Sequence, residues 1–161
     1  MADAAQQAPQ AQSGAQPGVF IDPYRSYNFK LLVAGVTEGH FTYCSDMEID
    51  IEPIRYREGG ISQIVHRLPG PVNYGAITLR YGLTGSRELW DWMMTAVKGK
   101  VQRKNVSVVL LDADGVTEVL RWDLLNTWPC RWRGAQLDTM SREVALEELT
   151  LVFETLERAE G

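Results

Sequence analysis

The chain has 161 residues, of which 45% are hydrophobic and 23% charged, and it carries a formal net charge of −5. A chain of this length and apolar content folds as one domain with a hydrophobic core, which excludes a disordered protein. No apolar run approaches the roughly 18 residues that a membrane-spanning helix requires. The acidic balance argues against binding nucleic acid through a basic surface.

Residues 1–19 consist mainly of Ala, Gln, Pro, Gly and Ser, with almost no large apolar side chain. Such a segment cannot offset the entropy of ordering by burial, so we predict a flexible tail, with a docking arm as the alternative. A single folded domain is expected over residues 20–161. The N-terminus lacks the basic start and apolar stretch of a signal peptide, so we expect assembly in the cytoplasm, with Cys44 and Cys130 as packed, free thiols.

Two strands are predicted next, over residues 29–36 and 40–52. The first is apolar on both faces, and the second alternates between apolar and polar side chains. Turn residues at 37–39 favour a hairpin, and Pro53 is expected to interrupt the second strand. The polar face of that strand carries four carboxylates, here called the acidic ladder: Asp46, Glu48, Asp50 and Glu52.

The acidic ladder has three interpretations. Carboxylates on one face of a strand repel each other unless they face water or meet basic side chains. The ladder is therefore a solvated face, a surface opposite arginines, or the wall of a water-filled channel that repels acidic cargo. The arginines could belong to the same chain or to a neighbouring subunit, and the candidates are Arg55, Arg57, Arg67 and Arg80.

Residues 54–72 combine a Gly59-Gly60 pair with the breaker sequence Leu68-Pro69-Gly70-Pro71. We expect a long, protruding excursion whose regular structure is broken at Leu68.

The hydrophobic period changes from two to about three and a half within residues 77–94. Alternation from Ile77 to Leu83 predicts a strand, and the later apolar spacing predicts a helix over about residues 86–98. Ser86 is the expected N-cap, and Gly99 suits the helix end.

The remaining sequence predicts strands. Residues 106–111 and 116–125 flank the turn Asp112-Ala113-Asp114-Gly115, which is the strongest hairpin signal of the chain. Another strand is expected at Trp128–Trp132, with Pro129 at an edge or bulge, and a bulged strand rather than a helix over residues 143–154. About seven or eight strands and one helix predict a mainly β fold, an antiparallel sandwich or barrel.

No residue set predicts catalysis, a cofactor or a metal. The 112–115 sequence resembles the start of a calcium loop but lacks its later ligands, and His40 and His66 have no partner at zinc-ligand spacing. Glu147 and Glu148 are adjacent in a strand and should point to opposite faces, so we expect a solvated bulge there rather than an acid–base couple. The tryptophans are expected in the core or in contacts.

A resemblance rests on several motifs in order: Asn28-Phe29-Lys30-Leu31, Leu68-Pro69-Gly70, the run from Ile77 to Trp92, and Leu149-Thr150-Leu151. Over roughly Tyr27 to Arg158 the chain resembles the tail tube proteins of contractile phage tails and extracellular contractile injection systems. It is also similar to the ring protein of type six secretion.

The resemblance implies a structural, non-catalytic protein that forms hexameric rings, which stack into a hollow tube driven through a target envelope by sheath contraction. Each subunit would contribute four strands to a common barrel, and closure across subunits would cover every open strand edge. Twenty-four strands leave a lumen of roughly 40 Å. The implied partners are copies of itself, the sheath, the baseplate, tube initiator and terminator proteins, and tape-measure or effector cargo. Specific nucleic-acid recognition and membrane insertion are not implied. The particle would be a phage tail or an injection device released from the cell.

Within this interpretation, contacts between rings or subunits are assigned to Ile54, Arg55, Tyr56, Arg57, Glu58, Gly59, Gly60, Leu68, Pro69 and Gly70. The charges of the channel wall are assigned to Asp46, Glu48, Asp50, Glu52 and Arg80. The alternative function is a small β-barrel that binds an apolar ligand in its interior, lined by the tryptophans.

Overall fold

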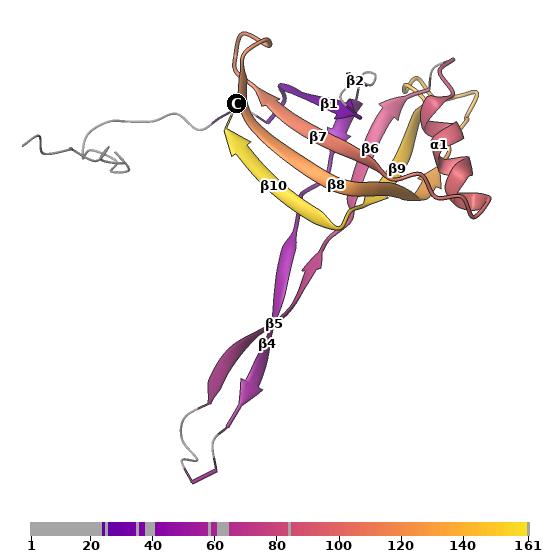
Figure 1. Ribbon diagram of the computed structural model, residues 1–161. Helices are drawn as coiled ribbons and strands as arrows, with labels where there is room; N and C mark the ends of the chain where they lie inside the picture. The colour runs from indigo at the N-terminus through magenta and orange to yellow at the C-terminus, as the bar shows by residue number, and fades with distance from the viewer. Residues whose placement is uncertain are drawn as a thin grey trace, which may run out of the picture.

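The computed structural model describes residues 24, 26–34, 36–37, 41–57, 59–60, 65–83 and 85–160. These residues form ten β-strands and one α-helix in a curved β body, from which a long two-stranded arm projects (Figure 1). The predicted mainly antiparallel β fold with one helix is confirmed. The predicted tail and the start of the predicted domain lie outside the described residues. No described helix has the length and apolar character needed to cross a membrane.

The body is one continuous sheet that folds back on itself as two layers, joined by the long strand β8. The five-stranded layer runs in the order β2, β1, β7, the first part of β8, β10. The four-stranded layer runs in the order last part of β8, β9, β6, β3. All pairings are antiparallel. The strands of the body are β1 (Phe29–Val33), β2 (Val36–Thr37), β3 (Phe41–Cys44), β6 (Ile77–Gly82), β7 (Lys104–Leu111), β8 (Glu118–Arg133), β9 (Leu146–Val152) and β10 (Thr155–Glu160).

Strand β8 crosses both layers because its second half continues through Pro129 instead of starting a new strand. Strands β9 and β10 follow one side of β8 in the same direction, interrupted only at residues 153–154. The register shifts between Pro129 and Arg131, which confirms the bulge predicted at Pro129, whereas the bulge predicted at Glu147-Glu148 is wrong because both residues pair regularly with β6. A bulge strengthens the local twist, which suits a strand that turns from one layer into the other.

The hydrophobic core fills the space between the layers. Leu31, Val106 and Leu124 of the five-stranded layer face a set of fully buried residues from the four-stranded layer: Ile77, Leu79, Leu149 and Leu151. Burying one such side chain contributes about 1.5–3 kcal/mol, so this cluster is the main source of stability. The periodicity of β6 had predicted its buried face correctly.

Helix α1 (Glu88–Val97) packs at one side of the sandwich. Trp92 is 2% exposed, and its indole N–H donates to the backbone oxygen of Gln102 over 2.8 Å. The ring of Trp90 meets that of Trp132 edge to face, with 4.7 Å between centroids. The helix begins two residues later than expected, and Arg87 rather than Ser86 occupies the N-cap, so the Ser86 cap prediction is wrong.

Two predicted hairpins have opposite outcomes. The β7–β8 hairpin is confirmed, and its turn is held by Asp112 and Asp114, whose carboxylates accept backbone N–H bonds. The hairpin between the first two predicted strands is wrong, because β1 pairs with β7 and β3 pairs with β6. The predicted strand 40–52 is also interrupted, since β3 ends at Cys44 and the next strand begins at Ile49.

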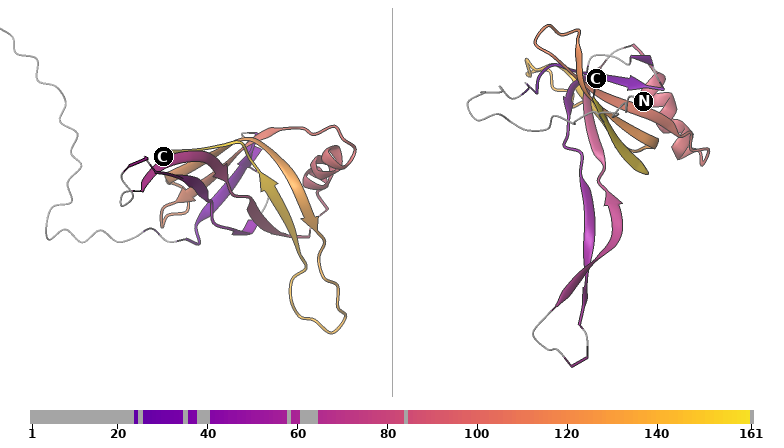
Figure 2. Two further views of the ribbon diagram at one scale, coloured as in Figure 1. Left: turned by 90° about the horizontal axis from the view of Figure 1, so that it is seen from below. Right: turned by 60° about the vertical axis from the view of Figure 1, so that its left-hand side comes forward.

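The arm consists of β4 (Ile49–Tyr56) and β5 (His66–Tyr74), which pair only with each other. It protrudes as expected (Figure 2). Pro53 does not interrupt β4 and Leu68–Pro71 does not break β5, because Pro53 lies opposite Pro69 within the ladder. Each strand of a two-stranded ribbon has an open edge, where a proline forfeits no ladder bond.

Candidate assembly surfaces

The two faces of the arm have opposite polarity along its length. Because β4 alternates, Ile49 and Ile51 share a face with Arg55 and Arg57, while Asp50 and Glu52 share the other with Ile54 and Tyr56. Strand β5 follows the same division: Val72 opposes Ile51, Arg67 opposes Arg55, and Leu68 opposes Ile54. One face is therefore apolar at the root and basic towards the tip. The other is acidic at the root and apolar towards the tip.

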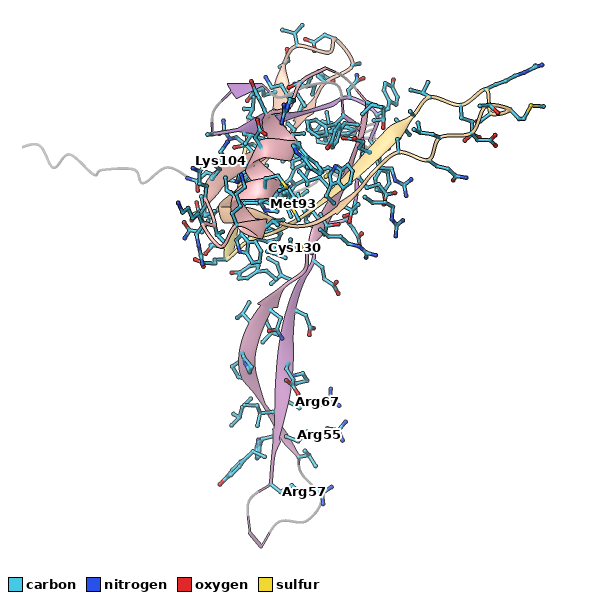
Figure 3. The ribbon with its side chains drawn as sticks, turned by 90° about the vertical axis from the view of Figure 1, so that its right-hand side faces the viewer. Arg55, Arg57, Arg67, Met93, Lys104 and Cys130 are labelled. Carbon is cyan, nitrogen blue, oxygen red and sulfur yellow. The ribbon has the colours of Figure 1, made fainter. Side chains whose placement is uncertain are left out.

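The basic part of the arm holds three arginines, Arg55, Arg57 and Arg67. Their guanidinium groups project from the same side of the arm (Figure 3), and with Val65 they line a depression of about 510 Å³. Directly opposite like charges destabilise a strand pair. None of the ion pairs found among the described residues includes these arginines. Basic groups in this arrangement suit an acidic partner.

The apolar parts of the arm are also open to solvent. Ile51, Ile54, Tyr56 and Leu68 are each about half exposed. Of these, Ile54, Tyr56 and Leu68 share one face of the arm, and exposed apolar surface of this kind is typical of a contact surface. The root is fixed to the body, since the ring of Tyr74 packs on that of Phe153 with 5.8 Å between centroids.

The structure separates the predicted channel-wall residues. Arg80 lies on β6 in the four-stranded layer, whereas Asp46 and Glu48 lie in the connection to the arm, and Asp50 and Glu52 lie on the arm itself. All four carboxylates are exposed. The acidic ladder is therefore not the face of one strand. Asp46 and Glu48 lie between β3 and β4, and Asp50 and Glu52 lie on the arm, which projects away from the body.

Among the residues predicted for contacts between rings, the described ones all belong to the arm: Ile54, Arg55, Tyr56, Arg57, Leu68, Pro69 and Gly70 in or next to its strands, and Gly59 and Gly60 at its tip. Glu58 lies outside the described residues. A Cβ atom at Gly70 would collide with the backbone oxygen of Glu52. Glycine is therefore required where β5 carries the extra residue that shifts the register of the arm.

The outer face of the four-stranded layer carries two cross-strand rows of polar residues. In the first row, Arg80 Nε donates to Glu148 over 2.8 Å, and the same carboxylate accepts from Arg133 over 3.3 Å. The guanidinium of Arg80 also lies 4.7 Å from the ring centroid of Tyr43. This row crosses all four strands, from β3 to β8.

The second row lies beside the first. The hydroxyls of Thr78 and Thr150 are 3.3 Å apart, and Arg131 is the next residue across the ladder. Arg131 and Arg133 are exposed. The sequence had shown them as polar positions alternating with tryptophans, but it could not show that they share a face with Arg80.

The four-stranded layer has an open edge on each side. Strand β3 pairs only with β6, and residues 128–133 of β8 pair only with β9. The polar face of the layer thus ends at two unpaired strand edges, which are templates for pairing with further strands.

A further surface was not predicted as a contact. The connection from β8 to β9, residues 134–145, exposes Leu137, Met140 and Val144, each by at least 75% of its area. It leaves the four-stranded layer at the end where Gly82 pairs with Leu146, whereas the arm leaves at the end where Ile77 pairs with Leu151. The connection and the arm therefore extend from opposite ends of the layer (Figure 3).

Perturbed ionisable groups do not form a reactive set. Burial raises the pKa of the Cys44 thiol to about 11, and burial together with Glu147 raises the pKa of Tyr81 to about 12. Cys44 and Cys130 are free thiols as expected, but only Cys44 is partly buried, whereas Cys130 is exposed and not packed. Glu147 lies beside Tyr81 while Glu148 binds Arg80, so the two carboxylates point to opposite faces as predicted. In the described part of the chain, no group of three potential metal ligands comes together.

Open sheet edges, a polar outer face and a protruding arm are features typical of a structural β protein. Residues 25–157 match the family model described as T4-like virus tail tube protein gp19, and the chain belongs to this family. It is therefore a tail tube protein of contractile tails and injection systems, and not an enzyme.

The solved structures agree with this family. A chain of the PVC sheath–tube complex of an extracellular contractile injection system is 26% identical, with a TM-score of 0.78, and the match covers 86% of this chain and 93% of that one. A chain of the anti-feeding prophage tube-terminating cap is 22% identical with a TM-score of 0.82, covering 94% and 100%. Hcp1 from Flavobacterium johnsoniae shares the fold at 18% identity and a TM-score of 0.55, covering 84% and 97%. A sequence search of curated proteins finds no match.

Proposed function

We propose that this tail tube protein forms hexameric rings in which the four-stranded layer of each subunit lines the lumen. The observation that carries this proposal is the four-stranded layer itself, which has one buried apolar face, one polar face and two open edges. Pairing β3 of one subunit with the 128–133 segment of the next covers both edges and closes a 24-stranded barrel. The polar rows then face the lumen, and Arg80 is a channel-wall residue.

The rings stack head to tail, because the two ends of the four-stranded layer differ. One end bears the arm and the other bears the 134–145 connection, so the contact between rings joins two unlike surfaces and repeats without limit. Such an open repeat produces a tube. The exposed Leu137, Met140 and Val144 supply apolar area on the ring face opposite the arm.

The arm extends from one ring to a neighbouring ring. Its tip half is basic on one face and apolar on the other, while its root half is acidic on one face and apolar on the other. The tip of one arm is therefore complementary to the root of another, with Arg55, Arg57 and Arg67 placed against the carboxylates of Asp50 and Glu52. This pairing supplies the acidic partner that the arginines lack within the described chain.

Further partners follow from the family. The similar chains come from a sheath–tube complex and from a tube-terminating cap. We expect the outer surface of this tube to contact a sheath, and its ends to contact baseplate and cap proteins. The assembled particle is a phage tail or an extracellular injection device, loaded with a tape-measure protein or with effector cargo.

Size-exclusion chromatography and negative-stain electron microscopy of the purified chain test the proposal. Rings and stacked tubes are expected, and a small particle whose tryptophan fluorescence responds to lipophilic ligands would contradict it. That second outcome would support the apolar-ligand barrel, which the structure does not favour because core side chains such as Ile77 and Leu149 fill the space between the layers.

The role of the arm is tested separately by Arg55→Glu together with Arg57→Glu. Rings should form but fail to stack, with the monomer still folded by circular dichroism. Lys100→Glu, which reverses an exposed charge next to α1, is the control and should leave the tubes intact. Tubes of normal length from the double variant would exclude the arm from stacking.

A further inference from the structure

The face assigned to the lumen is basic, although the whole chain is acidic. The charged residues on its strands are Arg80, Arg131, Arg133 and Glu148, so the strands carry three positive charges and one negative charge, while Asp46 and Glu48 lie beyond the end of β3. Glu148 binds both Arg80 and Arg133. Arg131 forms no ion pair among the described residues. Each subunit thus contributes two net positive charges to this face.

The outer face of the five-stranded layer is built differently. Its cations are matched by neighbouring carboxylates: Lys30 pairs with Glu118 over 2.6 Å, and Arg121 pairs with Asp123 over 2.8 Å. Arg103 pairs with Glu154 at the border of the same face. Of the two layers of the body, only the four-stranded layer therefore carries an excess of unmatched arginine on its outer face.

Closure into a ring repeats the excess six times around one bore. About twelve net positive charges then surround each ring's section of lumen, and the low-dielectric wall focuses their field inward. Arginine binds carboxylates through two parallel N–H bonds, which favours a partner with surface Asp and Glu. The hydroxyls of Thr78 and Thr150 add hydrogen-bonding groups that carry no charge.

The width of the lumen favours a folded acidic protein over a DNA duplex as the bound anion. A folded domain of about 100 residues has a radius of gyration of about 13 Å and a diameter of roughly 34 Å, so it nearly fills a lumen of roughly 40 Å. A centred DNA duplex, roughly 20 Å across, leaves about 10 Å to the wall on each side. That gap exceeds the Debye length of about 8 Å at physiological salt. Only the folded domain contacts several subunits at once.

We propose that the lumen wall binds folded protein cargo with an acidic surface, through Arg80, Arg131 and Arg133 of each subunit. This inference rests on the proposed function, because it requires the four-stranded layer to face the lumen. Binding is multivalent and electrostatic, so cargo is retained at low salt and released as the salt concentration rises. A wall made only of the acidic ladder would repel the same cargo.

The experiment assembles tubes in the presence of a fluorescent acidic protein of about 100 residues and a neutral counterpart of the same fold. Retention is measured by cosedimentation, and residence in the lumen by protection from an added protease. We expect the acidic probe alone to be retained and protected. Arg131→Gln with Arg133→Gln should reduce retention at least tenfold, because the loss is repeated around the ring. Glu148→Gln should increase retention.

The matched control is Lys30→Gln with Arg103→Gln, which removes the same charge from the outer face of the five-stranded layer and its border and should leave retention unchanged. Tubes that do not retain the acidic probe, or that retain it equally after the Arg131 and Arg133 substitutions, would overturn the inference alone. Equal or stronger retention of a labelled DNA duplex would overturn the assignment to protein cargo. Failure of the chain to form rings or tubes would instead contradict the proposed function, and this inference with it.

Discussion

Arg67→Glu separates the stability of the arm from its proposed role in stacking. Arg67 lies directly opposite Arg55 in the β4–β5 ladder, and both side chains are exposed. The substitution replaces a like-charge cross-strand pair by an opposite-charge pair. Such a pair contributes about 0.2–1 kcal/mol, so the unassembled chain should be as stable as the wild type or slightly more stable.

Stacking should respond in the opposite direction. If Arg67 meets carboxylates of a neighbouring arm, the substitution removes an attraction of about 0.5 kcal/mol and adds a repulsion of similar size. With six arms per ring, the junction between rings loses about 6 kcal/mol, which corresponds to roughly a 10⁴-fold weaker association. Arg67→Gln removes only the attraction, so it should weaken the junction by about 3 kcal/mol, or roughly 10²-fold.

Tube length by electron microscopy and the ring-to-tube ratio by sedimentation velocity measure the junction. Thermal unfolding of the unassembled chain measures the arm and the body. Asp50→Lys with Glu52→Lys in the same chain as Arg67→Glu should restore part of the lost length, because it reverses the proposed acidic partner. Normal tubes from Arg67→Glu, or short tubes that the compensating substitutions do not lengthen, would refute the pairing of arm tip and arm root.

Three further predictions concern the body, the arm and the pH dependence of stability. Leu149→Ala, at a position with no exposed area, should lower the free energy of unfolding by about 2–5 kcal/mol in urea denaturation, and a loss below 1 kcal/mol would contradict its place in the core. Gly70→Ala should distort the arm and shorten tubes while leaving the melting temperature of the body within a few degrees; tubes of normal length would show that the arm tolerates a Cβ atom there. Desolvation raises the pKa of Asp123, but the Ser107 hydroxyl and the Arg121 guanidinium outweigh it and hold that pKa below its usual range. The stability from this carboxylate is therefore present above about pH 4 and is lost as the pH falls through the lowered pKa, so Asp123→Asn should lose less stability than the wild type between pH 5 and pH 2.

Local signals in the sequence predicted local structure well. The turn between β7 and β8 was predictable because Asp112, Asp114 and Gly115 have their own turn chemistry, and Gly115 adopts a φ of +71°. The change of period after Gly82 located the end of β6 and the start of α1 to within two residues. The N-cap was misplaced because several polar residues precede the helix, and propensity alone does not choose among them.

Strand partners were not predictable in the same way. Strand β1 pairs with β7 across more than seventy residues, and no property of Phe29–Val33 identifies that partner. The rule that proline ends a strand also failed at Pro53, Pro69 and Pro71. It assumes a strand paired on both sides, whereas the arm has only two strands and protrudes from the body.

The candidate surfaces depend on these long-range pairings. Arg80, Glu148 and Arg133 form one row only because β6, β9 and β8 are neighbours in this register. The predicted contact residues were local to one excursion of the chain, and the structure collects the described ones on one arm. A correct prediction of the channel wall depends on where β3 ends. Polar and apolar residues continue to alternate through Asp46 and Glu48, so the sequence gives no sign that the strand has ended at Cys44.

The net charge of a chain is thus a poor guide to the charge of a surface that one layer alone supplies. Successive side chains of a β-strand point to opposite faces. The outer face of the four-stranded layer therefore carries Arg80 of β6, Arg131 and Arg133 of β8, and Glu148 of β9. The carboxylates of Asp50 and Glu52 leave with the arm because β3 stops at Cys44. In the proposed tube, this division places positive charge along the bore, where cargo lies, and places opposite charges on the two halves of each arm, where rings meet. A longer β3 would alter both surfaces together. It would place the carboxylates of the acidic ladder on the wall of the lumen and remove them from the junction between rings.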